Sequence, residues 1–144
     1  MFLSIILSVI LVLICTAIHY SALRLTTQAV SPSRHPRRCL FVAVTLILVA
    51  HILETLIYAG GYWVAVFWFA IGELTQSQDA SVPLRFMDYF YFALVNLTTL
   101  GRGDLVPSEH LRFITGISAF HGFLLITASG GYLLQVMSGK DPFR

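Results

Sequence analysis

The residues whose spacing most clearly suggests chemistry are those of the run Thr98–Asp104, which reads TTLGRGD. Two glycines, Gly101 and Gly103, stand one residue apart between a threonine pair and an aspartate. Glycine adopts backbone angles that other residues avoid, and alternating it with other residues lets successive carbonyl oxygens point the same way. Because a ring of such carbonyls can replace the water shell of a cation, this run indicates an ion pathway.

Three ionisable side chains lie inside apolar stretches, where such groups are functional candidates by default. His51 and Glu54 are three residues apart, so a helix places them on one face, and His121 lies in the middle of a later stretch. A proton-sensitive or metal-binding cluster of the three, and with it a membrane metal-binding protein, is one hypothesis. A histidine–carboxylate hydrogen bond that ties neighbouring helices together is the one we favour. The other histidines lie near stretch ends or in loops, and we expect only solvation of His19, His35 and His110.

The composition is that of an integral membrane protein. Of 144 residues, 57% are hydrophobic and only 11% are charged, against about 25% charged in soluble domains. The net charge of +2 is too small to suggest nucleic acid as a partner. The two cysteines, Cys15 and Cys39, are expected to be buried small hydrophobic residues. We see no nucleophile–base pair, phosphate-binding loop or cysteine–histidine metal spacing, so we expect neither an enzyme nor a cofactor.

Three apolar stretches are long enough to cross a bilayer, which takes about 20 residues. A fourth, within 86–98, is too short to cross and is typical of a re-entrant helix, which is tolerated only where protein or water surrounds it. The sequence therefore predicts an all-α membrane protein. Its expected order is a transmembrane helix (1–25), a basic loop (26–38), an outer helix (39–72), an outer loop (73–85), a pore helix (86–98), the glycine run (99–104), an inner helix (109–137) and a tail (138–144).

The positions of arginine and lysine predict the orientation. The loop 26–38 carries three arginines and no acid, and the tail carries Lys140 and Arg144. Because cytoplasmic loops are enriched in such residues, we expect both in the cytoplasm and the N-terminus outside, together with the segment 73–110. One short re-entrant segment per chain cannot close a ring alone, so we infer a cyclic homo-oligomer.

The order of helix, outer loop, short re-entrant helix, glycine run and closing helix resembles the pore module of potassium channels, whose commonest filter reads TVGYGD. The resemblance covers residues 42–136 and extends to small bacterial channels with an additional N-terminal helix. It implies a homotetramer in the cell membrane, here a bacterial inner membrane, that conducts monovalent cations, potassium first among them, with membrane lipids as further partners. The residues that fit the filter pattern are Thr99, Leu100, Gly101, Gly103 and Asp104, and Pro107 fits a proline often found just after it.

The resemblance also implies roles for single residues. Gly122 falls where the family often has a hinge in the inner helix, although close helix packing is the commoner use of such a glycine. Asn96 can bond behind the filter or be satisfied by its own helix, and Val95 stands where some members carry an acid. The filter would comprise Thr98, Thr99, Leu100, Gly101, Arg102, Gly103 and Asp104, with support from Asp88, Val95, Asn96 and Glu109.

Arg102 departs from the family, which usually has tyrosine or phenylalanine there. Four such charges about 10 Å from an ion, at an effective dielectric near 20, would each cost roughly 1.7 kcal/mol, or about 7 kcal/mol together. That is enough to empty an outer cation site. Either Arg102 turns away from the axis and pairs with Asp104 or Asp88, or it relaxes the filter, which becomes weakly selective or closed. The alternative function is therefore a weakly selective channel or a channel-like regulatory subunit that does not conduct.

Overall fold

The computed structural model describes residues 1–30, 36–79, 81–101 and 103–139. The described residues form α1 (Phe2–Ala29), α2 (Pro36–Phe67), β1 (Leu74–Gln76), α3 (Phe86–Leu97), β2 (Leu105–Pro107) and α4 (Leu111–Met137). The expectations stated for His35, Arg102, Lys140 and Arg144 therefore lie outside the described residues.

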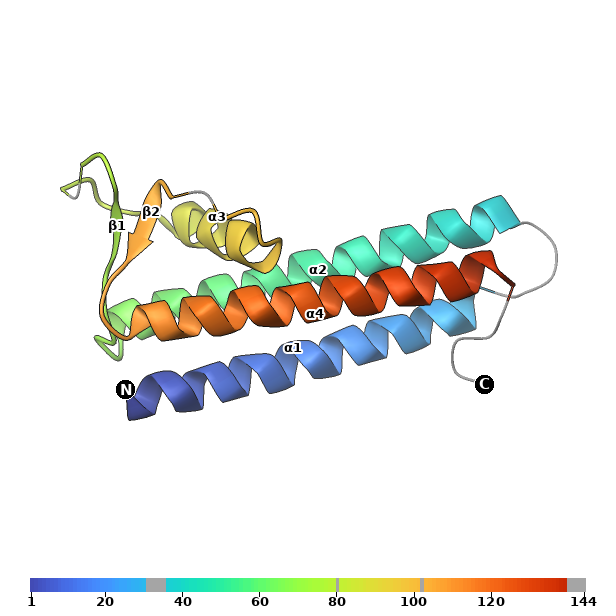
Figure 1. Ribbon diagram of the computed structural model, residues 1–144, viewed down its shortest axis with the longest axis horizontal. Helices are drawn as coiled ribbons and strands as arrows, with labels where there is room; N and C mark the ends of the chain where they lie inside the picture. The colour runs from blue at the N-terminus through green and yellow to red at the C-terminus, as the bar shows by residue number, and fades with distance from the viewer. Residues whose placement is uncertain (31–35, 80, 102, 140–144) are drawn as a thin grey trace.

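Three long helices, α1, α2 and α4, run side by side along the molecule (Figure 1). They contain 28, 32 and 27 residues, which at 1.5 Å per residue gives lengths of about 40 to 48 Å, more than the roughly 30 Å of a bilayer core. All three are also apolar enough to cross a membrane. The chain is thus a mostly helical, multi-pass membrane protein.

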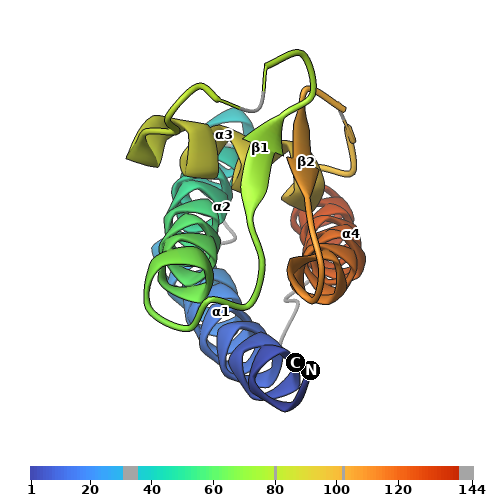
Figure 2. The ribbon, with the colours of Figure 1, turned by 90° about the vertical axis from the view of Figure 1, so that its left-hand side faces the viewer.

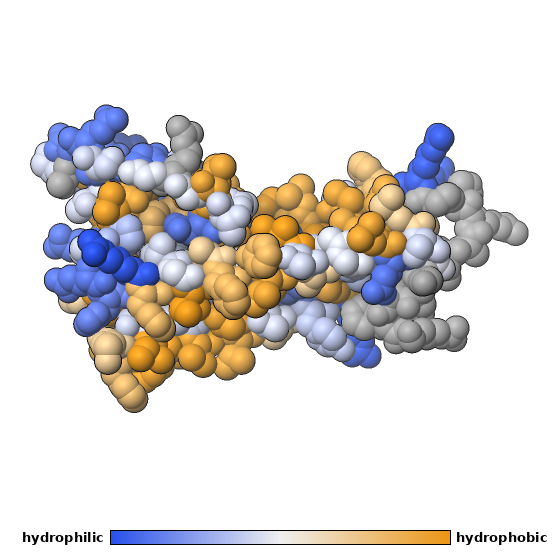
Figure 3. Space-filling model, in the orientation of Figure 1, coloured by the Kyte–Doolittle hydropathy of each residue, from blue (hydrophilic) through white to orange (hydrophobic). Residues whose placement is uncertain are grey.

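The long helices turn polar and small residues inward and apolar residues outward. Leu13 on α1 is 64% exposed, whereas Ser8 and His19 on the same helix are buried. Figure 3 shows the result as an apolar middle region between two more hydrophilic ends. Lipid tails are as apolar as leucine, so helices in a membrane associate through close packing and polar contacts. The buried residues of α1 are Ser4, Ser8, Leu11, Cys15, His19 and Thr26.

The short helix α3 packs against α2 and α4, on the side of the molecule opposite α1 (Figures 1 and 2). Its 12 residues span about 18 Å at 1.5 Å per residue, too little to cross the bilayer. The Phe92 ring meets Tyr62 of α2 edge-on, with centroids 5.0 Å apart. The Tyr62 hydroxyl in turn lies 2.5 Å from the Ser118 hydroxyl of α4. One buried tyrosine therefore connects all three helices.

A two-stranded ribbon joins the two connections that flank α3, a small addition to an otherwise helical chain that was not expected within the loop 73–85. Strand β1 pairs antiparallel with β2, with Thr75 opposite Val106. Beyond the strands, the Glu73 N–H donates to the Ser108 hydroxyl and the Ser108 N–H donates to the Glu73 carbonyl, each at 2.8 Å. The segment after α2 and the segment before α4 are thereby held together.

Several helix boundaries also differ from those expected. Helix α1 continues to Ala29, into the expected loop 26–38, because the Thr26 and Thr27 hydroxyls donate to carbonyls of their own helix at 2.7 and 3.0 Å and so do not draw it into a turn. Helix α2 begins at Pro36, since proline is favoured in the first turn, and it ends at Phe67 instead of residue 72. Helix α4 begins at Leu111 instead of residue 109, because Glu109 has a φ of 45°, outside the helical range.

Candidate functional site

The glycine run follows the end of α3 directly. The Thr98 N–H and hydroxyl both donate to the Leu94 carbonyl, at 3.0 and 2.7 Å, and close the helix. Left-handed backbone conformations then occur at every second residue, since Thr99 has a φ of 58° and Gly101 a φ of 60°. Glycine accepts this conformation freely, but a threonine there costs of the order of 1–3 kcal/mol and persists only where the surroundings enforce it.

The surroundings of the run hold its N–H groups and leave its carbonyls available. The Thr99 N–H donates to the Asn96 carbonyl at 2.9 Å, and the Gly101 N–H donates to the Val95 carbonyl at 3.1 Å. Within the described part of the loop, no hydrogen bond from another described residue reaches the carbonyls of Thr99, Leu100 or Gly101. These oxygens can therefore accept from, or coordinate, a ligand.

The loop is exposed in the single chain. Thr98, Thr99 and Gly101 are exposed, and Leu100 is 65% exposed although its side chain is large and apolar. Irregular backbone at membrane depth is stable only when protein or a water-filled cavity surrounds it. The single chain therefore leaves the residues Thr98–Gly101 uncovered.

The side chains expected to support the run have other contacts. Asp88 accepts the Arg85 N–H at 2.7 Å and caps the first turn of α3, and the Asn96 amide donates to the Phe92 carbonyl of its own helix at 2.7 Å. Glu109 is exposed and makes no hydrogen bond or ion pair with another described residue. Val95 is buried and reaches the run through its backbone carbonyl.

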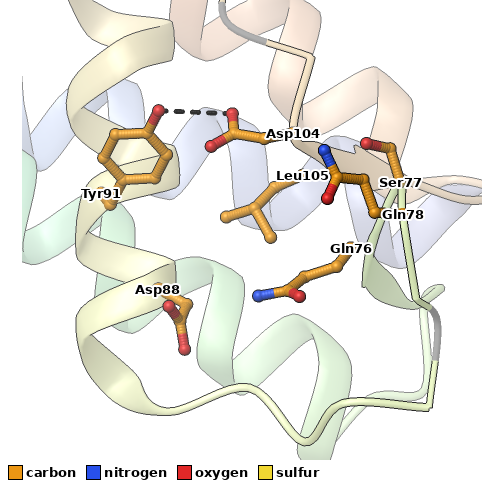
Figure 4. A pocket seen from close by; sticks show the side chains of 7 residues that line it. All are labelled: Gln76, Ser77, Gln78, Asp88, Tyr91, Asp104 and Leu105. Carbon is orange, nitrogen blue, oxygen red and sulfur yellow. Dashed lines mark hydrogen bonds between the residues drawn. The ribbon is translucent and has the colours of Figure 1, made fainter.

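Tyr91 is a supporting residue that the sequence reasoning missed. Its hydroxyl donates to Asp104 Oδ1 at 3.3 Å, and the Ser77 N–H donates to the Asp104 carbonyl at 2.9 Å. Figure 4 shows this hydrogen bond between Tyr91 and Asp104 at one edge of the hollow that both residues line. The available signal was position, because Tyr91 lies one helical turn after Asp88 and thus on the same outer half of α3. This hollow has a volume of about 300 Å³ and is lined by Gln76, Ser77, Gln78, Asp88, Tyr91, Asp104 and Leu105.

The outer loop carries a further fixed negative charge. The Ser81 hydroxyl and backbone N–H donate to Asp79 Oδ1 at 2.6 and 3.0 Å. These hydrogen bonds favour the ionised carboxylate, so they hold the pKa of Asp79 below its usual value. Asp79 is therefore charged at neutral pH.

Gly122 is a close-packing position on α4. A Cβ placed there would lie 2.6 Å from Leu97 Cα and would also overlap the Leu97 carbonyl oxygen. Only a glycine lets α4 approach the last turn of α3 this closely. The structure thus gives Gly122 the packing role that was weighed against a hinge, and the hinge stays a prediction.

The buried polar cluster differs in membership from the one expected. One oxygen of the Glu54 carboxylate lies 2.9 Å from His51 Nδ1, and the other oxygen lies 3.0 Å from His19 Nδ1. His19 is 4% exposed, so the expectation that it is merely solvated is wrong. The Ser129 hydroxyl of α4 lies 3.1 Å from His51 Nε2 and 3.3 Å from His19 Nε2. The cluster therefore joins α1, α2 and α4.

His121 lies outside that cluster. Its Nε2 lies 3.0 Å from the Thr16 hydroxyl and its Nδ1 lies 2.9 Å from the Tyr58 hydroxyl. The grouping of His121 with His51 and Glu54 is thus replaced by two adjacent networks. The signal for His19 was its spacing of four residues from Cys15, which places both on one face of α1.

Comparison with known proteins identifies the class. The sequence profile of the ion-channel family matches residues 41–139, more than half of the chain. A curated relative, the uncharacterized membrane protein YdjJ of Bacillus subtilis, is 33% identical over 90 residues, which cover 57% of this chain but 26% of YdjJ. No solved structure matches. With two spans, a short intervening helix and a glycine run inside the matched region, the chain belongs to the ion-channel family of two-transmembrane, potassium-channel-type domains.

Proposed function

We propose that this protein is a homotetrameric cation channel in which the glycine run is the filter and potassium is the permeant ion. The observation that carries the proposal is the backbone of Thr99–Gly101. The N–H groups of Thr99 and Gly101 are bonded to the last turn of α3, and no hydrogen bond from another described residue reaches the carbonyls of Thr99, Leu100 or Gly101. A backbone arranged in this way supplies oxygen ligands for a dehydrated cation.

The exposed loop supports a ring of several copies. One chain contributes one loop, and the described residues of that loop are exposed on the surface of the chain. A symmetric assembly would bury it in protein and place its carbonyls around a common axis. Helix α4 offers an apolar surface for such contacts, because large side chains project from it unburied, including Phe120 at 64% and Leu134 at 68% exposure. In this assembly α3 is a re-entrant pore helix.

Charge supports both the orientation and the sign of the ion. Between α2 and the first turn of α4, residues 73–112 carry five acids and three arginines, so this end of the molecule is net negative and attracts cations. The opposite end, where α1 ends and α2 begins, carries the arginines of the segment 34–38. The excess of arginine marks that end as cytoplasmic, and we place the filter end and the N-terminus outside.

Arg102 decides how well the filter conducts. Its candidate partners each have one contact already, Asp104 with Tyr91 and Asp88 with the Arg85 N–H. A carboxylate has about four acceptor sites, so either acid can still receive the guanidinium. We propose that Arg102 turns away from the axis and pairs with one of them, which leaves the carbonyls free to coordinate the ion.

Ion flux tests the proposal. Wild type and Arg102→Tyr are reconstituted in matched liposomes, and potassium, sodium and chloride fluxes are measured side by side, with Arg112→Gln as a control that changes an exposed outer arginine outside the run. We expect cation flux from wild type, blocked by removing the glycines of the run. A verified tetramer that passes no cation, but acquires potassium flux as Arg102→Tyr, would instead identify a regulatory subunit that does not conduct. No flux from either tetramer would overturn the channel assignment.

A further inference from the structure

Four side chains form a closed ring of polar contacts at the junction of α1, α2 and α4. The Glu54 carboxylate lies 3.0 Å from His19 Nδ1 and 2.9 Å from His51 Nδ1. On the far side, the Ser129 hydroxyl lies 3.3 Å from His19 Nε2 and 3.1 Å from His51 Nε2. We propose that this ring is a binding site for one proton, which holds α1 against the pore-forming helices.

Counting hydrogens identifies the proton. Four contacts need four hydrogens. An ionised Glu54, two neutral histidines and the serine hydroxyl supply three, since a neutral imidazole carries one and a hydroxyl carries one. With three, both Nδ1 atoms donate to the carboxylate, both Nε2 atoms are acceptors, and the single Ser129 hydrogen can serve only one of them. A fourth hydrogen on one Nε2 lets that nitrogen donate to Ser129 Oγ, and every contact is then satisfied.

Charge favours the same state. With three hydrogens the ring has a net charge of −1, and a fourth hydrogen makes it neutral. In the state that we propose, this hydrogen is on a histidine, and the imidazolium balances the carboxylate. Glu54 is 1% exposed and His19 is 4% exposed, and α1, α2 and α4 are the membrane-spanning helices. A net charge at this depth is costly. A divalent metal held by the same atoms would leave a net charge of +1, so the ring matches a proton better than a metal ion.

The surrounding groups do not supply the missing charge. From α1, the Cys15 thiol faces the Glu54 backbone carbonyl at 3.9 Å. From α2 and α4, Tyr58 and His121 bond to each other at 2.9 Å. A neutral His121 has one donor and one acceptor nitrogen, which is sufficient for its two hydroxyl partners. Among the described residues, no lysine, arginine or further acid is hydrogen-bonded or ion-paired to the ring.

Substituting Glu54→Gln gives a variant that should keep the four contacts of the ring and lose the imidazolium. The amide oxygen accepts from one Nδ1 and the amide nitrogen donates to the other. The second histidine then donates from Nε2 to Ser129, whose hydroxyl donates to the first. All four contacts are made by neutral groups, so the variant should fold with α1 in place.

The test uses the full chain in lipid nanodiscs at pH 7, with ¹⁵N-labelled histidine rings observed by NMR and assigned with the single variants His19→Asn, His51→Asn and His121→Asn. We expect one imidazolium per chain, shared between His19 and His51, and a neutral His121. In Glu54→Gln we expect that imidazolium to be absent. The thermal unfolding midpoint of wild type should then fall relative to Glu54→Gln as pH rises, because wild type loses the fourth hydrogen and the neutral ring of the variant does not.

Three results would overturn the proposal. They are a wild type whose His19 and His51 are both neutral or both imidazolium at pH 7, an imidazolium that persists in Glu54→Gln, and a stoichiometric metal in elemental analysis of the purified protein. The wild-type count alone decides the matter if the variant does not assemble. None of these readouts depends on conduction, so the inference and the channel proposal fail separately.

Discussion

The contact between Gly122 and α3 gives the sharpest prediction. In Gly122→Ala the new Cβ would start 2.6 Å from Leu97 Cα, whereas ordinary van der Waals contacts begin at 3.4 Å. The atoms in the way are backbone, so no side-chain rotation relieves the overlap and α3 must move away from α4. Overpacking of this kind costs about 1–3 kcal/mol, against which alanine recovers roughly 0.5–1 kcal/mol of helix propensity. We expect a net loss of up to about 2.5 kcal/mol relative to wild type, and a loss of about 1–3 kcal/mol relative to a glycine-to-alanine change that meets no atom.

Two matched variants on the same helix isolate this effect. A Cβ at Gly116 or Gly130 would meet no atom of its own chain within 4 Å, so Gly116→Ala and Gly130→Ala should leave a chain as stable as wild type or slightly more so. Stability is measured by denaturant titration in mixed micelles with circular dichroism, and filter integrity by potassium flux. Because the obstructing atoms are backbone, adding Leu97→Ala should not rescue Gly122→Ala.

The outcome separates packing from hinge bending. If Gly122→Ala is as stable as the two control variants, the close approach of α3 and α4 is not what this glycine provides. A variant with wild-type stability but altered opening would support the hinge prediction instead. A loss of stability together with a loss of flux is the result expected from the packing geometry and the proposed filter, because Leu97 immediately precedes the glycine run.

Three further predictions concern polar contacts. His19→Ala removes one of the two histidines that face the buried Glu54, so unfolding measurements should show a loss of about 3–5 kcal/mol, while exposed His110→Ala should stay within about 0.5 kcal/mol of wild type; equal effects would contradict the buried site. Tyr91→Phe should lose about 0.5–1.5 kcal/mol and reduce potassium flux without dissociating the oligomer, and unchanged flux would argue against a role for the Asp104 contact. Asp104→Asn keeps an acceptor for the tyrosine, so its stability loss by the same titration should be smaller than that of Asp104→Ala.

The sequence was sufficient for the class of protein and for the position of the short helix. Long apolar stretches are local signals, and the fourth apolar stretch, within 86–98, was too short to be a further span. The ribbon was not predicted, because its strands have three residues each and are separated by the whole of α3. Pairing over that distance depends on how α2, α3 and α4 pack together, which no local pattern records.

The polar cluster shows a second limit of sequence reasoning. The spacing of His51 and Glu54 placed them on one face, and the structure confirms that they are in contact. Which other residues join them depends on the rotation and depth of neighbouring helices. His19 and His121 both lie in apolar helices, and only tertiary packing puts the first on Glu54 and the second on Tyr58.

The ribbon has a consequence for the continuity of the chain. Strand β1 precedes α3, and β2 follows the glycine run. A cut between β1 and α3 therefore leaves β1 with α1 and α2 on the first fragment, and β2 with α3 and α4 on the second. The strand pairing and the hydrogen bonds between Glu73 and Ser108 would hold the two fragments together. A protease nick or an inserted epitope in this connection should therefore be tolerated, and it offers a position for labelling the folded protein without separating its helices.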